Sequence, residues 1–107
     1  MTAYVLIESR DPFESRDTEF FEQTAIAIHE RGHSVTVFLI QNGVLAARKD
    51  AGRLRRLTEA GLTLLADDLS LRERGIKAEE LVQGIEESGI DRLVEAIAQE
   101  NTKAIWH

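Results

Sequence analysis

The sequence of 107 residues has no cysteine, and this absence excludes more chemistry than any residue that is present. Without a thiol there is no disulfide, no thiolate metal site and no cysteine nucleophile. The longest apolar runs are far shorter than the roughly 20 residues that a membrane-spanning helix needs. The N-terminal segment also lacks the basic and apolar regions of a secretion signal. We therefore expect a cytoplasmic protein that does not enter a membrane.

Cations are also scarce, since 13 Lys and Arg face 19 Asp and Glu and the net charge is −6. An acidic chain without aromatic residues between its cations is not expected to bind nucleic acid. A hydrophobic content of 43% with only one proline is typical of a globular chain that builds its own core. The length predicts one domain over residues 1–107.

Strand-like and helix-like segments alternate along the chain. Phe21, Thr24, Ala25 and Ile28 recur at helical spacing and predict a helix over 18–31, with Asp17 as its N-cap. The remaining segments are predicted from the same patterns: strands at 4–7, 35–40, 62–66 and 103–106, and a helix-prone stretch at 44–60.

Two sequence boxes predict further helix starts. Ser70 with Glu73 predicts a short helix that Gly75 ends, and Ser88 with Asp91 predicts the last helix. Residues 78–87 fit either a helix or a helix followed by a short strand around 83–86.

Strands that are joined by helices pair in parallel through right-handed crossovers. The predicted fold class is therefore α/β, a three-layer α/β/α domain with a mainly parallel sheet of four to five strands. Ligands of such folds bind at the carboxyl ends of the strands, which directs attention to residues 9–17, 41–44 and 67–74. The loop after the first strand is either a pocket wall or only a connection.

One motif that suggests a metal is rejected on its context. His29, Glu30 and His33 spell the zinc-protease pattern H-E-x-x-H, which needs both histidines on one continuous helix. Gly32 is expected to end the helix before His33, so we interpret the pattern as a helix end. Asp67 and Asp68 are adjacent and point to opposite sides in extended chain, so they need not converge on one ion. No metal and no cofactor is predicted, since dinucleotide-binding and Walker motifs are also absent from the sequence.

A basic segment interrupts the acidic chain. It holds five cations within nine residues, namely Arg48, Lys49, Arg53, Arg55 and Arg56. Two interpretations stay open: a face that contacts a partner or a phosphate, and a solvated helix face on which Arg55 pairs with Glu59.

Three stretches carry a resemblance to a known family: the sequence from Phe38 to Val44, the Arg-Gly-Ile at 74–76, and residues 79–85 through Leu93 and Val94. In order and spacing they resemble the DsrE/DsrF-like family, over nearly the whole chain. The resemblance implies a small α/β protein of intracellular sulfur relay or sulfur oxidation. It also implies assembly into trimers or hexamers, because members of this family commonly form them.

The resemblance also implies where sulfur chemistry would occur. Active members carry a persulfide on a cysteine just before Arg-Gly-Ile, and that position corresponds to Asp67 or Ser70. Neither side chain forms a persulfide. We therefore expect no persulfide sulfurtransferase activity and favour a non-catalytic binding or partner subunit linked to sulfur metabolism.

The alternative is a small-molecule sensor or an enzyme that uses the same pocket at the strand ends. Its candidate binding residues are Asn42, Gly43, Asp67, Asp68, Ser70 and Arg74. If Ser70 starts a helix, the free amides there would favour an anion, and a cysteine at position 70 would be more acidic than a free thiol. No catalytic residue is assigned.

Self-association is expected from two apolar stretches. Ile105 and Trp106 lie at the end of the chain, and residues 44–47 follow the second strand. Burial between subunits would remove both from water. We expect a homo-oligomer, a trimer or hexamer rather than a dimer, and a protein partner is the other expected contact.

Overall fold

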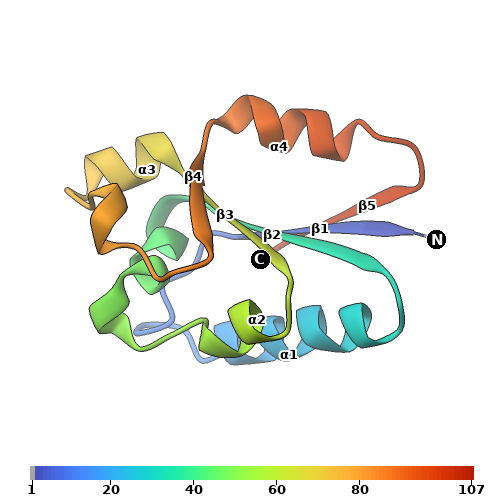
Figure 1. Ribbon diagram of the computed structural model, residues 1–107, viewed down its shortest axis with the longest axis horizontal. Helices are drawn as coiled ribbons and strands as arrows, with labels where there is room; N and C mark the ends of the chain where they lie inside the picture. The colour runs from blue at the N-terminus through green and yellow to red at the C-terminus, as the bar shows by residue number, and fades with distance from the viewer. Residues whose placement is uncertain (1) are drawn as a thin grey trace.

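The computed structural model describes residues 2–107 as five strands that alternate with α-helices and short 3-10 helices (Figure 1). In chain order the elements are β1 (Ala3–Glu8), α1 (Asp17–Glu30), β2 (Ser34–Leu39), η1 (Gln41–Ala47), η2 (Lys49–Ala51), α2 (Arg55–Glu59), β3 (Thr63–Asp67), α3 (Asp68–Glu73), η3 (Ala78–Glu80), β4 (Ile85–Ser88), α4 (Ile90–Ile97) and β5 (Thr102–Trp106).

The strands form one sheet in the order β4-β3-β2-β1-β5, and every neighbouring pair is parallel. Helices α1 and α2 cover one face, and α3 and α4 cover the other (Figure 1). The three-layer α/β/α fold is therefore confirmed, with five strands. Among residues 2–107, no helix has the length and apolar character to cross a bilayer.

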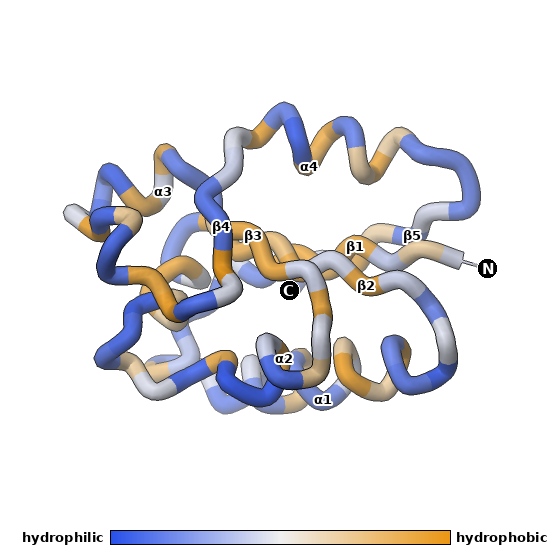
Figure 2. Tube along the Cα trace, in the orientation of Figure 1, coloured by the Kyte–Doolittle hydropathy of each residue, from blue (hydrophilic) through white to orange (hydrophobic). Residues whose placement is uncertain are grey.

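Alternating side chains of β1, which lies between β2 and the edge strand β5, divide the core between the two faces. Leu6 packs with Phe21 and Leu57 beneath α1 and α2, in the larger of two apolar clusters. Val5 and Ile7 point to the opposite face. Figure 2 shows the hydrophobic colour concentrated along the strands between the helical layers.

The layer on the α4 side is thinner. Its cluster contains Val5, Ile7, Phe38, Leu65 and Leu93, and Leu93 is the only buried residue of α4. The eight-residue α4 and six-residue α3 cannot shield five strands as the longer α1 helps to do on the other face. Apolar side chains are consequently left exposed on this side.

Several local predictions need correction. The segment 44–47 lies in a 3-10 helix, and Val44 and Ala47 are fully buried in the protein's own core, so this stretch is not exposed as the assembly argument required. Of the two alternatives for residues 78–87, the structure has the helix followed by a short strand: the 3-10 helix η3 precedes β4, which begins at Ile85.

The predicted N-caps are also wrong. Arg16 precedes α1, and Gly89 precedes α4, neither with a side-chain cap. Ser88 instead lies 3.3 Å from the Gly89 carbonyl oxygen, to which its hydroxyl donates.

The chain reverses direction across the sheet next to β1. From β1 the chain adds β2, β3 and β4 on one side and then returns to place β5 on the other. The loops that leave the neighbouring strands β1, β2 and β3 all begin at the carboxyl edge, the usual place of ligand sites in such sheets.

Candidate functional site

Asp67 and Ser70 form the centre of the predicted site, and both are buried, with 5% and 3% of their surface exposed. Asp67 ends β3 and is the N-cap of α3: its Oδ2 accepts from the Ser70 backbone N–H at 3.1 Å and from the Ser70 hydroxyl at 2.7 Å. The prediction that Ser70 starts the helix is wrong, because Ser70 lies one turn inside it.

The hydroxyl of Ser70 also connects two loops. Its oxygen accepts from the Gln41 backbone N–H at 2.8 Å. Gln41 has φ of 54°, a left-handed backbone conformation that residues other than glycine rarely adopt. The bond to Ser70 therefore holds the chain in a strained turn after β2. The polar groups of Asp67 and Ser70 therefore bond to one another and to the backbone.

Arg74 reaches across to Asn42 with two donors. Its Nε and Nη2 lie 3.1 Å and 2.9 Å from Asn42 Oδ1, and Nη1 donates to the Ser70 carbonyl oxygen at 3.1 Å. Arg74 also lies 3.8 Å from the carboxylate of Glu73. The structure thus brings Asn42, Ser70 and Arg74 together at one edge.

Gly43 makes room for the neighbouring strand. A Cβ at this position would lie 2.1 Å from the backbone oxygen of Glu8, so only glycine fits there. Asp68 lies apart from this group, because its carboxylate points toward Arg72, 4.0 Å away. The expectation that Asp67 and Asp68 need not share an ion agrees with these directions, and no group of three potential ligands for a metal occurs within residues 2–107.

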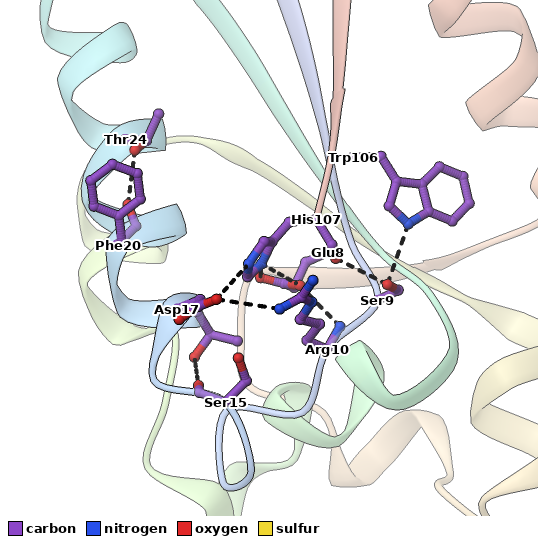
Figure 3. A network of polar contacts seen from close by, with 10 residues as sticks. Glu8, Ser9, Arg10, Ser15, Asp17, Phe20, Thr24, Trp106 and His107 are labelled. Carbon is purple, nitrogen blue, oxygen red and sulfur yellow. Dashed lines mark hydrogen bonds and ion pairs between the residues drawn. The ribbon is translucent and has the colours of Figure 1, made fainter.

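A second polar network lies at the same edge, and the sequence analysis missed it (Figure 3). Glu8 ends β1 and is buried; its carboxylate lies 2.9 Å from Nδ1 of His107 and accepts from the Arg10 backbone N–H at 2.9 Å. Asp17 completes the network, 3.3 Å from the Arg10 guanidinium and 3.7 Å from Nε2 of His107. The signal in the sequence was Glu8 at the end of an apolar strand, but nothing local identifies His107 as its partner.

His107 is held in place through both its ring and its backbone. It stacks on Phe21 with a centroid distance of 5.5 Å, and its backbone N–H donates to the Ile7 carbonyl at 2.8 Å. The His107 carbonyl accepts from the hydroxyl of Ser9 at 2.9 Å, and Trp106 Nε1 donates to that hydroxyl at 3.3 Å (Figure 3). The end of β5 is thereby fastened to the loop after β1.

A small cavity of about 20 Å³ lies beneath this network, large enough for one water molecule. Glu8 and Glu22 both line it. Burial raises the pKa of Glu22 above its usual range, while Arg53 and Arg56 act in the opposite direction.

The two networks meet at Asn42. Together with residues from the loop after β1, Asn42 lines an open hollow of about 410 Å³. Its other lining residues are Ser9, Arg10, Asp11, Glu14 and Ser15. The loop after β1 therefore lines a hollow at the carboxyl edge of the sheet.

The H-E-x-x-H pattern has the structure that its context predicted. Helix α1 ends at Glu30, and Gly32 has φ of 88°, so His29 and His33 do not share a helix. His33 packs edge-on against Tyr4 with a centroid distance of 5.3 Å. The interpretation as a helix end is confirmed.

The comparisons with known proteins agree with this architecture. The model of the DsrE/DsrF-like family matches residues 2–103. The chain belongs to this family. This DsrE-like chain is similar in fold to the YchN protein of E. coli, with a TM-score of 0.88, 19% identity and full coverage of both chains. It is also similar to MTH1491 of Methanobacterium thermoautotrophicum, a protein of unknown function, with a TM-score of 0.79, 23% identity and full coverage of both chains. No curated protein sequence matches it.

Membership links the DsrE-like chain to sulfur relay in general. The resemblance places the family's cysteine at Asp67 or Ser70, and in the structure these two residues are a buried, hydrogen-bonded pair at the start of α3. The chain therefore keeps the family's fold around a segment that has no thiol.

Proposed function

We propose that this DsrE-like chain is a non-catalytic subunit that binds its partners and carries no sulfur itself. One observation carries the proposal: Asp67 and Ser70 are buried and bonded to each other at 2.7 Å. A carboxylate and a hydroxyl form no persulfide, and their bonds hold the helix start and the loop after β2. The segment that would carry sulfur has a structural role here.

Exposed apolar side chains on the α4 side support assembly into a homo-oligomer. Ile90, Val94 and Ile97 lie at i, i+4 and i+7 along α4 and are 49%, 60% and 40% exposed. Trp106 on the edge strand β5 is 61% exposed and pairs in register with Ile7, whose side chain lies under α4. Exposed apolar side chains on one face favour association, and a second copy of the chain is the partner that we propose.

The setting of the proposal follows from the family. We place the subunit in the cytoplasm, in a trimer or hexamer, next to proteins that do carry sulfane sulfur. A cysteine-containing partner would supply the thiolate that this chain lacks.

Sulfur transfer tests the non-catalytic part. The purified chain is incubated with a cysteine desulfurase and cysteine, with a cysteine-containing family member as the positive control, and intact masses are recorded. We expect no adduct on this chain, whereas one sulfur atom would add about 32 Da. A stable adduct on any side chain contradicts the proposal.

Light scattering tests the assembly. We expect the mass of a trimer or hexamer, and we expect Val94→Asp to reduce it by placing a charge in the apolar contact. Ala27→Asp is the matched control, since Ala27 is exposed on α1 in the opposite layer. A monomeric mass for the unmodified chain would overturn the assembly proposal.

One observation favours the alternative of a small-molecule site: Asn42 borders the open hollow next to Arg10. A ligand there would compete for the bond between Arg74 and Asn42. A thermal-shift screen with nucleotides and thiol or acyl compounds tests it. Equal affinity of Asn42→Ala, Ser70→Ala, Arg74→Ala and the unmodified chain for any ligand found would rule out this site.

A further inference from the structure

The basic segment that follows η1 spans η2 and the start of α2, and it has no part in the proposed subunit role. Residues 48–56 contain five of the chain's 13 cations and one acid, Asp50, in a protein whose net charge is −6. Such a local concentration of positive charge needs a structural or functional reason.

Two left-handed residues set the path of this segment. Gly52 has φ of 66°, and Leu54 has φ of 63°, a conformation that costs a non-glycine residue free energy. Leu54 keeps it because its side chain is buried in the core. The turn between them places Arg53 at the surface, where its guanidinium carbon lies 5.2 Å from the centre of the Phe13 ring.

The segment forms one wall of an open groove with a cavity volume of about 450 Å³. We call it the basic groove, and its lining residues are Lys49, Gly52, Arg53, Arg55, Val82 and Gln83. Three of the six are cations and none is an acid. The volume is in the range of small-molecule sites.

The opposite wall is fixed to the rest of the protein. The Val82 backbone N–H donates to the Ala47 carbonyl at 2.8 Å, and Leu81 forms an isolated antiparallel bridge with Arg48. The groove is therefore formed by two segments far apart in the sequence that backbone bonds hold together.

Acids compensate the positive charge of the groove only in part, because Arg53 and Arg55 also line a neighbouring hollow with Glu19 and Glu22. Across residues 2–107, Lys49 and Arg53 make no ion pair within 4.0 Å, and Arg55 makes one, with the exposed Glu59 at 3.6 Å. Like charges that share a hollow without an acid repel one another, and an anion between them relieves that repulsion.

We propose that the basic groove binds a small phosphate-bearing molecule. The planar guanidinium groups of Arg53 and Arg55 match pairs of phosphate oxygens, and Lys49 adds a point charge. Val82 offers an apolar contact and Gln83 an amide for the organic part of the ligand. This site lies outside the segment around Asp67 and Ser70. A test that contradicts phosphate binding would therefore leave the proposed subunit role untouched, and the reverse also holds.

Titration with inorganic pyrophosphate and with a phosphomonoester, followed by calorimetry and by amide NMR, tests the site. We expect saturable binding with one site per chain and shifts centred on Gly52, Val82 and Gln83. The double variant Lys49→Gln/Arg53→Gln is expected to bind about tenfold more weakly or worse, because two charged contacts are lost.

The matched control is Arg31→Gln/Lys103→Gln, which removes the same charge from exposed positions outside the groove. It should bind like the unmodified chain at equal ionic strength. Equal weakening in both double variants would mean general screening and overturn the site, as would the absence of saturable binding. Binding of an acidic peptide but of neither phosphate probe would also overturn it, in favour of a protein partner. Thermal melting checks that both double variants are folded.

Discussion

The imidazole Nδ1 of His107 lies 2.9 Å from the buried carboxylate of Glu8, although 99 residues separate them in the sequence. A carboxylate only accepts, so Nδ1 carries the donated proton and Nε2 is directed toward Asp17, at 3.7 Å. The contact joins β1 to the neighbouring edge strand β5 at their carboxyl ends.

Removal of this imidazole should destabilise the fold. Among residues 2–107, His107→Ala leaves the buried Glu8 carboxylate with the Arg10 backbone N–H as its one hydrogen-bond donor, and we expect the free energy of unfolding to fall by about 2 kcal/mol. Urea denaturation measures it. His29→Ala, which changes a half-buried histidine on α1, is the control and should cost clearly less. Equal losses in the two variants would show that the Glu8 contact contributes nothing specific.

Gly43 should tolerate no side chain. A Cβ there would lie 2.1 Å from the Glu8 backbone oxygen, so Gly43→Ala must push η1 away from β1. We expect a loss of about 2 kcal/mol or more in unfolding free energy. Gly52→Asn, at a position with open space and a φ that asparagine accepts, should cost much less. Thermal and urea unfolding compare the two, and a neutral Gly43→Ala would contradict the packing.

A cysteine introduced at position 70 should be a poor sulfur carrier. Ser70 is buried and its hydroxyl faces the Asp67 carboxylate at 2.7 Å, and both burial and a nearby negative charge disfavour a thiolate. We therefore expect the pKa of the Ser70→Cys thiol to lie above that of a free thiol, about 8.5, which reverses the expectation from a helix-capping position. The pH dependence of alkylation measures it, and a thiol more acidic than a free one would contradict the structure.

Glu22 should make stability depend on pH. Burial raises its folded pKa above the ordinary value of 4.5, so at pH values between the folded and unfolded pKa the folded chain binds this proton more fully than the unfolded chain does. The contribution of Glu22 to the free energy of unfolding is therefore present below about pH 4.5 and is lost as pH rises through the folded pKa. Glu22→Gln should stabilise the fold at pH 7 and have little effect at pH 4. Glu19→Gln, at an exposed position one turn earlier, should show no such difference in unfolding free energy.

The layered architecture could be predicted because it depends on local periodicity. Two patterns indicate which faces are buried: the apolar run from Tyr4 to Ile7 and the helical spacing from Phe21 to Ile28. Helices between the strands then require parallel pairing. The approach of the loop after β2 to Ser70 could also be expected, since neighbouring parallel strands end at the same edge of the sheet.

Other features required the fold itself. Whether Asp67 or Ser70 caps α3 depends on the residue at which the chain turns out of β3, and both residue types are good caps. Burial of residues 44–47 depends on the sheet that they pack against. The pairing of Glu8 with His107 depends on β5 returning to lie beside β1, a placement that no local pattern encodes. Composition and periodicity determined the layers and the missing thiol, whereas contacts between distant segments decided the side chains' partners, because such contacts form only when the sheet brings the strand ends together.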